Sequence, residues 1–434
     1  MITVSDFFCG AGGSSTGAVQ VPGVRVELAA NHWKLAVDSH SANHPGARHD
    51  IADLSQVDPR RYPKTDIAWL SPSCTNHSIA KGARRSDQLP DLFGDVLPDE
   101  AAERSRATMW DVIRFAEHHR YRAIIVENVV DAAAWVLWPA WSAALTALGY
   151  EYRLVSLNSM HAAALGPAAP QSRDRMYVVA WRTGERAPDL NRWARPIAEC
   201  PQHGRVRAIQ AWRREGRTVG KYKSQYVWRC PRVECRNTEV RPQVRPAADI
   251  IDWALPAARI TDRPKPLAAK TMKRIREGFA AYTARPLVVP VEGREGKKAR
   301  PADEPLRTCT ARNETGLAYM VELRGGGSKH RPVSEPLATV CASGNHHGLV
   351  SGKAIAASVE QMRFRMLSPD EYRAAMAFPG DYVLLGTRRE RVRMAGNAVT
   401  PPAARDLIAA VAESITGEQI EPAAVHAQPL RRAA

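Results

Sequence analysis

Long apolar runs are missing from this 434-residue sequence, and none approaches the ~20 residues that a membrane-spanning helix needs. The first residues hold no basic segment followed by a long apolar run, so we expect no secretory signal. The seven cysteines are an odd number spread over a long chain, without the dense pattern of a disulfide-stapled protein. These absences argue against a membrane protein or a disulfide scaffold and predict a soluble, cytoplasmic protein with reduced thiols.

Acidic residues are too few to balance the basic ones. Lys and Arg total 61 against 45 Asp and Glu, which gives a net charge of +16. Such an excess favours a polyanionic partner, above all nucleic acid, although a generally basic surface is the alternative. The length allows two domains with separate cores. Strand and helix patterns alternate over the first part of the chain, which predicts an α/β fold.

One cysteine stands directly after a predicted strand. The apolar run Ile67–Leu70 predicts a short buried strand, and Ser-Pro-Ser after it is a turn signal. Cys74 is therefore expected in a loop at the carboxyl end of a strand, where open α/β sheets collect ligands and chemistry. A thiol there can be a nucleophile if its pKa is lowered, whereas a small buried thiol is the plainer alternative.

A glycine-rich loop follows the first predicted strand, Ile2–Phe8, and precedes a predicted helix. Glycines in this position let backbone approach a ligand closely, although Ser15 occupies the last position of a dinucleotide fingerprint and weakens that reading. The next two strands end at Asn31-His32-Trp33 and at Asp50-Ile51. Polar and aromatic side chains at successive strand ends suit an adenosine ligand, and ordinary loop residues are the alternative.

Charged residues mark two further strand ends. A predicted strand over 123–126 ends at Glu127, and a carboxylate near a cysteine at another strand end is a sensible acid and nucleophile pair. Arg173 and Arg175 lead into the predicted strand 176–181, where alternation puts both guanidinium groups on one face. Together they could clamp a base carbonyl or a phosphate. A solvated glutamate and exposed strand arginines are the alternatives.

The strand and helix alternation fades from Thr183 onward, and arginine and proline become frequent. Two ligand pairs, Cys200 with His203 and Cys230 with Cys235, flank a basic segment rich in aromatic residues. Two pairs of thiolate or imidazole ligands on short turns are what tetrahedral Zn²⁺ requires, so we predict a structural zinc. The alternative is three unrelated thiols and a surface histidine.

The later part of the chain contains an internal repeat. Residues 301–311 match 332–342, which suggests two similar β-rich recognition pieces. Ser368, Pro369 and Glu371 form the pattern of a helix capping box. A last long helix is expected after the segment that begins at Gly396.

Six of these stretches, taken in chain order, resemble the motifs of the DNA cytosine-5 methyltransferases. Any one of them is weak evidence, whereas six in the family's order are specific. The matching stretches are Asp6-Phe7-Phe8-Cys9-Gly10-Ala11-Gly12-Gly13, Pro72-Ser73-Cys74, Glu127-Asn128-Val129, Gln171-Ser172-Arg173-Asp174-Arg175, Arg365–Glu371 with Phe378-Pro379, and Gly396-Asn397-Ala398-Val399.

The resemblance implies an α/β fold with a Rossmann-like domain that binds S-adenosyl-L-methionine (AdoMet). Residues 1–183 would form its first part, and 356–434 would return to complete it. Residues 184–355 would be an inserted, mostly β or irregular target-recognition domain that holds the zinc ligands and the repeated segments. The implied partner is double-stranded DNA with a flipped-out cytosine. We expect a monomer of the restriction-modification type, without a nuclease segment of its own.

The resemblance also implies roles for individual residues. Cys74 would attack C6 of the cytosine, Glu127 would hold N3, and Arg175, with Arg173 near it, would sit at the base O2 and the active-site loop. His32 stands where the family normally has the glutamate that binds the ribose hydroxyls. The AdoMet site would comprise Phe8, Gly10, Ala11, Gly12, Gly13, His32, Trp33, Asp50, Ile51, Asn397 and Ala398.

Three alternatives to methylation of DNA stay open from the sequence. The same chemistry on cytosine in structured RNA is one. Transfer of a different group from an AdoMet derivative is another, motivated by His32. A catalytically inactive DNA-binding relative is the third, and the presence of Cys74, Glu127 and Arg175 speaks against it.

Overall fold

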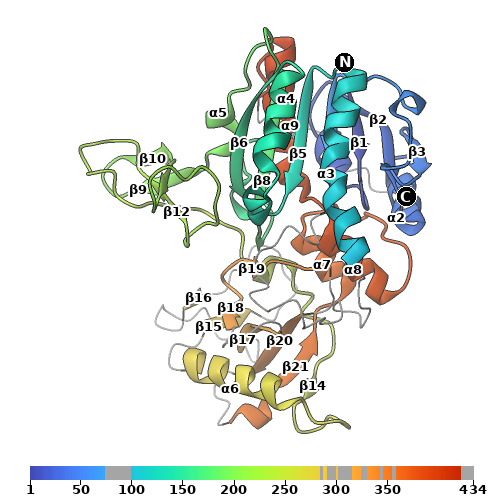
Figure 1. Cartoon of the computed structure of the whole chain (residues 1–434). Helices are drawn as coiled ribbons and strands as arrows, with labels where there is room; N and C mark the ends of the chain where they lie inside the picture. Colours follow the sequence, from blue (N-terminus) through green and yellow to red (C-terminus); the bar gives the residue numbers. More distant parts are fainter. Residues whose placement is uncertain are drawn as a thin grey trace.

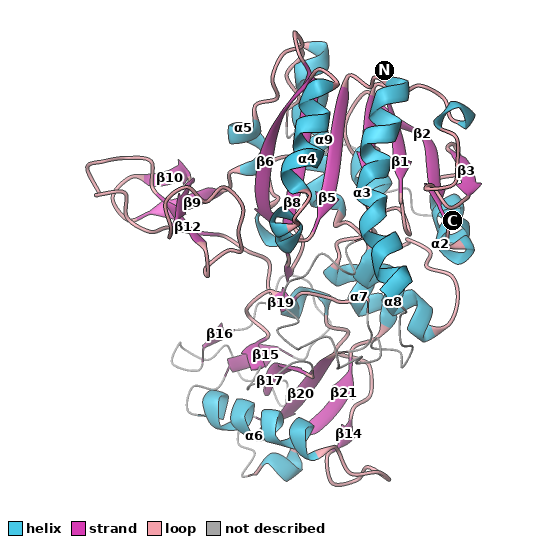
Figure 2. Cartoon of the chain, in the orientation of Figure 1, coloured by secondary structure: helices cyan, strands magenta, loops and turns pink. Residues whose placement is uncertain are grey.

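The computed structural model describes residues 1–73, 99–283, 287–290, 300–301, 315–323, 330–342, 346–353 and 358–421. Three bodies are visible in Figure 1: a layered α/β domain at the top, a β-rich domain below it, and a small lobe to the left. Figure 2 shows that helices flank the sheet of the upper domain, whereas the small lobe is built of strands and loops. Within the described residues, no helix is both long and apolar enough to span a bilayer.

A seven-stranded sheet forms the centre of the upper domain, with the order β3-β2-β1-β4-β5-β8-β6. The first five strands in this order run parallel, and β8 is antiparallel to both of its neighbours. Consequently the beginning of β8 lies beside the carboxyl end of β5. The strands are β1 (Ile2–Phe7), β2 (Val24–Asn31), β3 (Arg48–Ile51), β4 (Ile67–Leu70), β5 (Ala123–Asn128), β6 (Tyr150–Asn158) and β8 (Asp174–Arg182).

Helices cover both faces of this sheet. On one face, Phe115 and Trp141 of two of these helices pack against Phe7 and Val126 of the strands. On the other face, the apolar side of the last helix packs against Val4 and Ile125. The helices of the domain are α1 (Gly13–Ala18), α2 (Lys34–Asn43), α3 (Asp99–His119), α4 (Trp138–Ala147), α5 (Leu190–Ala194) and α9 (Pro401–Thr416), with short 3-10 turns η1 (Pro59–Arg61), η2 (Val130–Ala134) and η3 (Ser159–His161).

The lower domain is a second, mostly antiparallel sheet with the order β14-β21-β20-β17-β15-β16, to which β18 is added beside β17. Helix α6 (Ala269–Thr283) packs on it, and the Tyr319 hydroxyl donates to the Ile275 carbonyl at 2.7 Å. The strands are β14 (Ala258–Arg259), β15 (Leu287–Pro290), β16 (Arg300–Pro301), β17 (Thr315–Glu322), β18 (His330–Pro332), β20 (His347–Lys353) and β21 (Arg363–Met366), with 3-10 turns η4 (Ala247–Ile250) and η5 (Val359–Gln361).

Two connections join the upper and lower domains. Strand β7 (Gln171–Ser172) pairs with β19 (Leu337–Ala338), and helices α7 (Pro369–Ala375) and α8 (Arg388–Asn397) lie between the domains in Figure 1. The capping box expected at Ser368 is confirmed, because Ser368 and Glu371 exchange both of its hydrogen bonds. Helix α8 ends at Asn397, and the last helix expected after the segment at Gly396 follows it, beginning at Pro401.

We call residues 196–242 the side lobe. It contains a three-stranded sheet of β9 (Ile197–Cys200), β10 (Gly204–Arg207) and β13 (Arg241–Pro242). A hairpin of β11 (Ile209–Trp212) and β12 (Tyr226–Arg229) completes it. Its small core includes Trp228 and three cysteines, so this lobe has little apolar interior of its own.

Candidate active site

The carboxyl ends of the parallel strands meet along one edge of the main sheet. Phe7 pairs with both Ala30 and Leu70, and Asn31 pairs with Ile51. The residues that follow these strands therefore lie in a row along this edge. This places Phe8, His32 and Ser71 on the side of the sheet where α/β proteins bind ligands.

Glu127 and Arg175 form an ion pair at this edge. The Arg175 Nε and Glu127 Oε1 atoms are 2.7 Å apart, and the two side chains are only 14% and 12% exposed. Arg175 also donates from Nη1 to the carbonyl of Asp174 at 2.9 Å. A carboxylate and a guanidinium side by side present an acceptor and donors to a planar polar ring. The structure thus brings together two of the three residues predicted to act on the base.

Arg173 has a different environment from Arg175. It is 2% exposed, and its guanidinium donates to the carbonyls of Val340 at 2.7 Å, Gly396 at 3.0 Å and Ala398 at 3.1 Å. Burial, assisted by the nearby Arg175, lowers the pKa of Arg173 to about 10, so it stays charged at neutral pH. These carbonyls belong to segments that are distant from Arg173 in the sequence, so its guanidinium connects β8 to the segments at Val340 and at Gly396 and Ala398.

Cys74 lies outside the described residues, but the two residues before it are fixed. Asn128 donates from Nδ2 to the Pro72 carbonyl at 3.3 Å, and the Ser73 amide donates to Thr108 Oγ1 at 3.1 Å. Asn128 directly follows Glu127 on β5. The chain therefore leaves β4 next to the Glu127–Arg175 pair.

The glycine loop between β1 and α1 forms a backbone cradle. Phe8 and Gly10 have positive φ angles of 57° and 53°. A Cβ added to Gly10 would meet no described atom within 4 Å, whereas one added to Gly13 would overlap the Val399 carbonyl oxygen. Gly13 is thus required for internal packing, while Gly10 faces open space where a ligand can approach. The Tyr382 hydroxyl donates to the Ala11 carbonyl and holds the loop from the other side.

A buried polar network lies beneath this loop, and the sequence reasoning missed it. Asp6 Oδ2 accepts hydrogen bonds from the hydroxyls of Ser14 and Ser15, both at 2.6 Å. His40 Nε2 lies 2.8 Å from Ser15 Oγ, and His40 Nδ1 lies 2.8 Å from His49 Nε2. Burial raises the pKa of Asp6 to about 6. The sequence indicates only the position of Asp6 at the start of the glycine motif, and no pattern in it places His40 or His49 nearby.

The residues expected around adenosine have distinct surroundings. His32 is exposed at the end of β2, and Trp33 is half-buried with the Arg393 guanidinium 4.9 Å from its ring centroid. The Asp50 carboxylate accepts hydrogen bonds from Arg61 at 2.9 Å and from the Tyr62 hydroxyl at 2.8 Å.

Three further expected cofactor residues differ in exposure. Ile51, at the end of β3, and Asn397, at the end of α8, are exposed. Ala398, which caps that helix, is buried. An aromatic residue, exposed polar side chains and an open glycine cradle are features that fit a nucleoside ligand.

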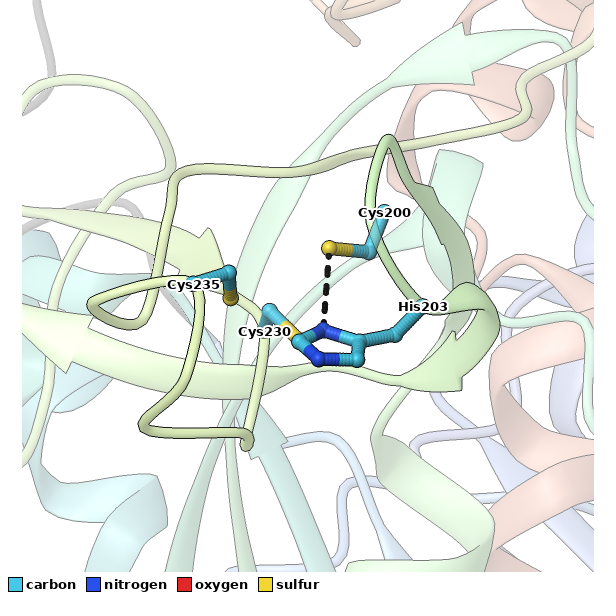
Figure 3. A group of neighbouring side chains, drawn as sticks. All are labelled: Cys200, His203, Cys230 and Cys235. Carbon is cyan, nitrogen blue, oxygen red and sulfur yellow. Dashed lines mark hydrogen bonds between the residues drawn. The ribbon is translucent and has the colours of Figure 1, made fainter.

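The four predicted metal ligands meet in the side lobe (Figure 3). The Nδ1 atom of His203 is 3.5 Å from the sulfurs of both Cys200 and Cys230, and the four ligand atoms, including Cys235 Sγ, lie within 4.8 Å of one another. A tetrahedral Zn²⁺ with typical Zn–S and Zn–N bonds separates sulfur from nitrogen by roughly 3.5 Å. The three cysteines are buried and His203 is half-buried, so the cluster is shielded from solvent.

Comparisons with known proteins identify the family and support the fold of the chain. The family model described as C-5 cytosine-specific DNA methylase matches residues 2–413. The solved structure of the S. pombe Dnmt2 methyltransferase is similar over 96% of this chain and 100% of its own, with 12% identity and a TM-score of 0.53, and supports the fold. A putative DNA modification methyltransferase encoded within an E. coli prophage shares 13% identity over 96% of this chain and 100% of its own, with a TM-score of 0.47. Among curated proteins, no match is found.

Proposed function

Because the chain belongs to the C-5 cytosine-specific DNA methylase family, we propose that it transfers a methyl group from AdoMet to C5 of a cytosine in double-stranded DNA. The observation that carries this proposal is the Glu127–Arg175 ion pair beside the point where the chain leaves β4 towards Cys74. The target carbon is buried inside a duplex, so the cytosine has to be flipped out to reach this pair.

The residue types suit the chemistry of cytosine. C5 is a poor nucleophile until a thiolate adds to C6, and Cys74 is the proposed nucleophile. After the methyl transfer, a base would remove the C5 proton and the C6–S bond would break to release the thiolate. Glu127 would hold N3 and favour its protonation as charge develops on the ring, and Arg175 would donate to the O2 carbonyl. The ion pair fixes both groups relative to each other before substrate binds, which reduces the reorganisation needed in the transition state.

AdoMet is the cofactor of cytosine-5 methyltransferases, and the residues at the glycine loop fit it. Phe8, Gly10 and Trp33 would hold the nucleoside and the amino-acid part, because Gly10 faces open space and both rings lie at strand ends. When bound, AdoMet supplies an electrophilic methyl group. His32 would meet the ribose hydroxyls with a ring nitrogen instead of a carboxylate, which weakens this contact and leaves room for a modified donor.

DNA is the proposed substrate in preference to RNA. The net charge of +16 supports binding of a polyanion, and the printed description of the family refers to DNA. Methylation of structured RNA is the second candidate, because a net charge of +16 favours either kind of nucleic acid. The proposed role is modification within a restriction-modification system.

We further propose that Cys200, His203, Cys230 and Cys235 bind a structural Zn²⁺. The sulfur-to-nitrogen distances of 3.5 Å and the burial of the thiols support it. The small core of the side lobe supports it as well, since a lobe with few apolar residues gains most of its stability from such a metal. Elemental analysis of purified protein would find about one zinc per chain, and a Cys235→Ser variant with full zinc content would refute the ligand set.

Mass spectrometry of nucleosides tests the proposed reaction. Purified protein is incubated with AdoMet and either unmethylated duplex DNA or transcribed tRNA, and each nucleic acid is digested and analysed. We expect 5-methylcytosine in DNA only. A product confined to tRNA would refute the DNA proposal, and a heavier 5-substituent in DNA recovered from cells would indicate a modified donor. Cys74→Ala should abolish the product, whereas Cys309→Ala, a matched change at another cysteine, should not.

A further inference from the structure

The side lobe contacts the strand that holds Arg175 and the turn that follows the strand holding Glu127. The Tyr222 amide donates to Asp174 Oδ1 at 3.0 Å, and Asp174 lies between Arg173 and Arg175 at the start of β8. Asn158 Nδ2 donates to the same oxygen at 3.0 Å. The carboxylate of Asp174 therefore links the lobe to the backbone that orients Arg175.

A second contact reaches the turn η2, which follows the strand that holds Glu127. Lys221 Nζ lies 3.3 and 3.2 Å from the two carboxylate oxygens of Asp131. Asp131 belongs to η2, which begins two residues after the end of β5 and therefore follows Glu127 closely. Lys221 and Tyr222, which belong to the lobe segment 220–223, thus contact the backbone regions on both sides of the ion pair.

This lobe segment is itself tied to the upper domain. The Gly220 amide donates to Ser156 Oγ at 3.0 Å, and Gln210 donates from Nε2 to the Ser156 carbonyl at 2.7 Å. A Cβ on Gly220 would lie 2.8 Å from the Gln225 side chain, so the chain is closely packed here. The segment therefore has little room to shift independently of the hairpin β11–β12.

The hairpin connects the segment to the proposed metal site. Lys223 bonds through its amide to the Tyr226 carbonyl at 2.8 Å, and β12 runs from Tyr226 directly to the ligand Cys230. Two residues before this cysteine, the buried Trp228 donates from Nε1 to His161 Nδ1 at 3.1 Å. A metal ion that fixes Cys230 thereby fixes the strand from which the 220–223 segment is held.

From these contacts we propose that the metal-bound side lobe positions the Glu127–Arg175 pair for catalysis, through Tyr222 on Asp174 and Lys221 on Asp131. The inference rests on the proposed function for its catalytic meaning and on the proposed zinc for its stability. Lys221, Asp131 and Asp174 are positioning residues that do not touch substrate. Because small displacements of catalytic groups reduce rates strongly, loosening the lobe should lower kcat more than substrate affinity.

The alternative role for the lobe is docking of nucleic acid, since ten of its arginine and lysine side chains are exposed. Lys221 and Asp131 separate the two roles. A phosphate contact by Lys221 predicts that Lys221→Met weakens DNA binding and that Asp131→Asn, which removes a negative charge, strengthens it. A positioning role predicts instead that both variants lower kcat.

The experiment compares Lys221→Met, Asp131→Asn and the double variant with the wild type and with Lys223→Met as a matched control. Lys223 is an exposed lysine of the same segment whose Nζ lies 6.0 Å from the Tyr222 ring centroid. We expect kcat to fall roughly 3- to 10-fold in each single variant and no further in the double variant, because an exposed ion pair contributes modestly. KM for DNA should change less than 2-fold, and Lys221→Arg should restore kcat.

Hydrogen exchange provides a readout that does not depend on activity. Peptides covering 124–131 and 172–179 should exchange faster in Lys221→Met than in Lys223→Met, with zinc content unchanged in both. Unchanged exchange, or a loss of DNA affinity shared by the two lysine variants at constant kcat, would overturn the proposal. A wild-type protein without methyltransferase activity would refute the proposed function alone, because the exchange measurement would still decide the positioning role.

Discussion

Replacing Arg173 with methionine should destabilise the protein by about 3 kcal/mol. The guanidinium donates three hydrogen bonds to backbone carbonyls, and a hydrogen bond to a charged group contributes ~1.5–3 kcal/mol. Against this, burial lowers the pKa of Arg173 to about 10, and this shift corresponds to a cost of roughly 3 kcal/mol for burying the charged group. The difference leaves a net destabilisation of ~1.5–6 kcal/mol, since methionine retains most of the apolar contact but leaves three carbonyls without these donors.

Urea unfolding followed by circular dichroism measures this change. Arg173→Met should shift the midpoint to lower urea concentration, and Arg173→Lys should fall between it and the wild type because it keeps the charge but loses the planar fork. The exposed Arg186 is the control, and Arg186→Met should stay within ~0.5 kcal/mol of the wild type. If Arg173→Met were as stable as Arg186→Met but had lost activity, Arg173 would be a substrate contact and our assignment would be refuted.

Three further predictions follow from the same edge of the sheet. Glu127→Gln keeps the side-chain size but removes the charge, so kcat should fall by about 100-fold or more with DNA affinity near wild type in a filter-binding assay. Burial, with a smaller contribution from nearby His49, lowers the pKa of His44 to about 4, whereas its value in the unfolded chain is near 6.5. The stability that neutral His44 provides is therefore complete above pH ~6.5 and is lost as the pH falls towards 4. His44→Phe should reduce the fall in unfolding free energy between pH 7 and 4.5 by about 2–3 kcal/mol, and an unchanged pH slope would contradict this. Gly13→Ala should destabilise the fold strongly, because its Cβ overlaps the Val399 carbonyl. Gly10→Ala meets no described atom and is strained only by its positive φ, so it should be destabilised less and bind AdoMet more weakly in calorimetry.

Local patterns in the sequence were sufficient for the elements that carry the site. The apolar run 67–70 became β4, and the strand over 123–126 became β5 with its end extended to Asn128. Such runs are strong signals because they are fully buried between two helical layers. The family assignment from ordered motifs is likewise confirmed by the match over residues 2–413.

The roles of individual charged residues could not be predicted in the same way. Alternation placed Arg173 and Arg175 together, yet only one of them forms the ion pair with Glu127, and the other donates to carbonyls more than 160 residues away in sequence. The network of Asp6 with His40 depends on how α2 packs against the glycine loop, which no local pattern encodes. Contacts between distant segments are set by tertiary packing, and one sequence does not reveal them.

The target-recognition role of residues 184–355 also stays a prediction. The segment 184–355 was expected to be one recognition domain, whereas in the structure it contributes α5 to the upper domain and further elements to the side lobe and the lower sheet. Strand β21 (Arg363–Met366), assigned beforehand to the returning segment, pairs with β20 in that lower sheet. The four residues of the Cys/His cluster were recognisable by their spacing, whereas the attachment of their lobe to β6 was not.

The packing of α9 on the main sheet has a consequence for how the protein is made. About 220 residues separate the end of β8 from the start of α9, so a ribosome working at ~5–20 residues per second needs roughly 10–45 s to deliver that helix after the last sheet strand. During this interval Val4, Ile67 and Ile125 expose an apolar face that their own chain covers only later. Nascent chains of this protein should therefore depend on chaperones in that window, and a fragment that stops before Pro401 should be recovered mainly as aggregate.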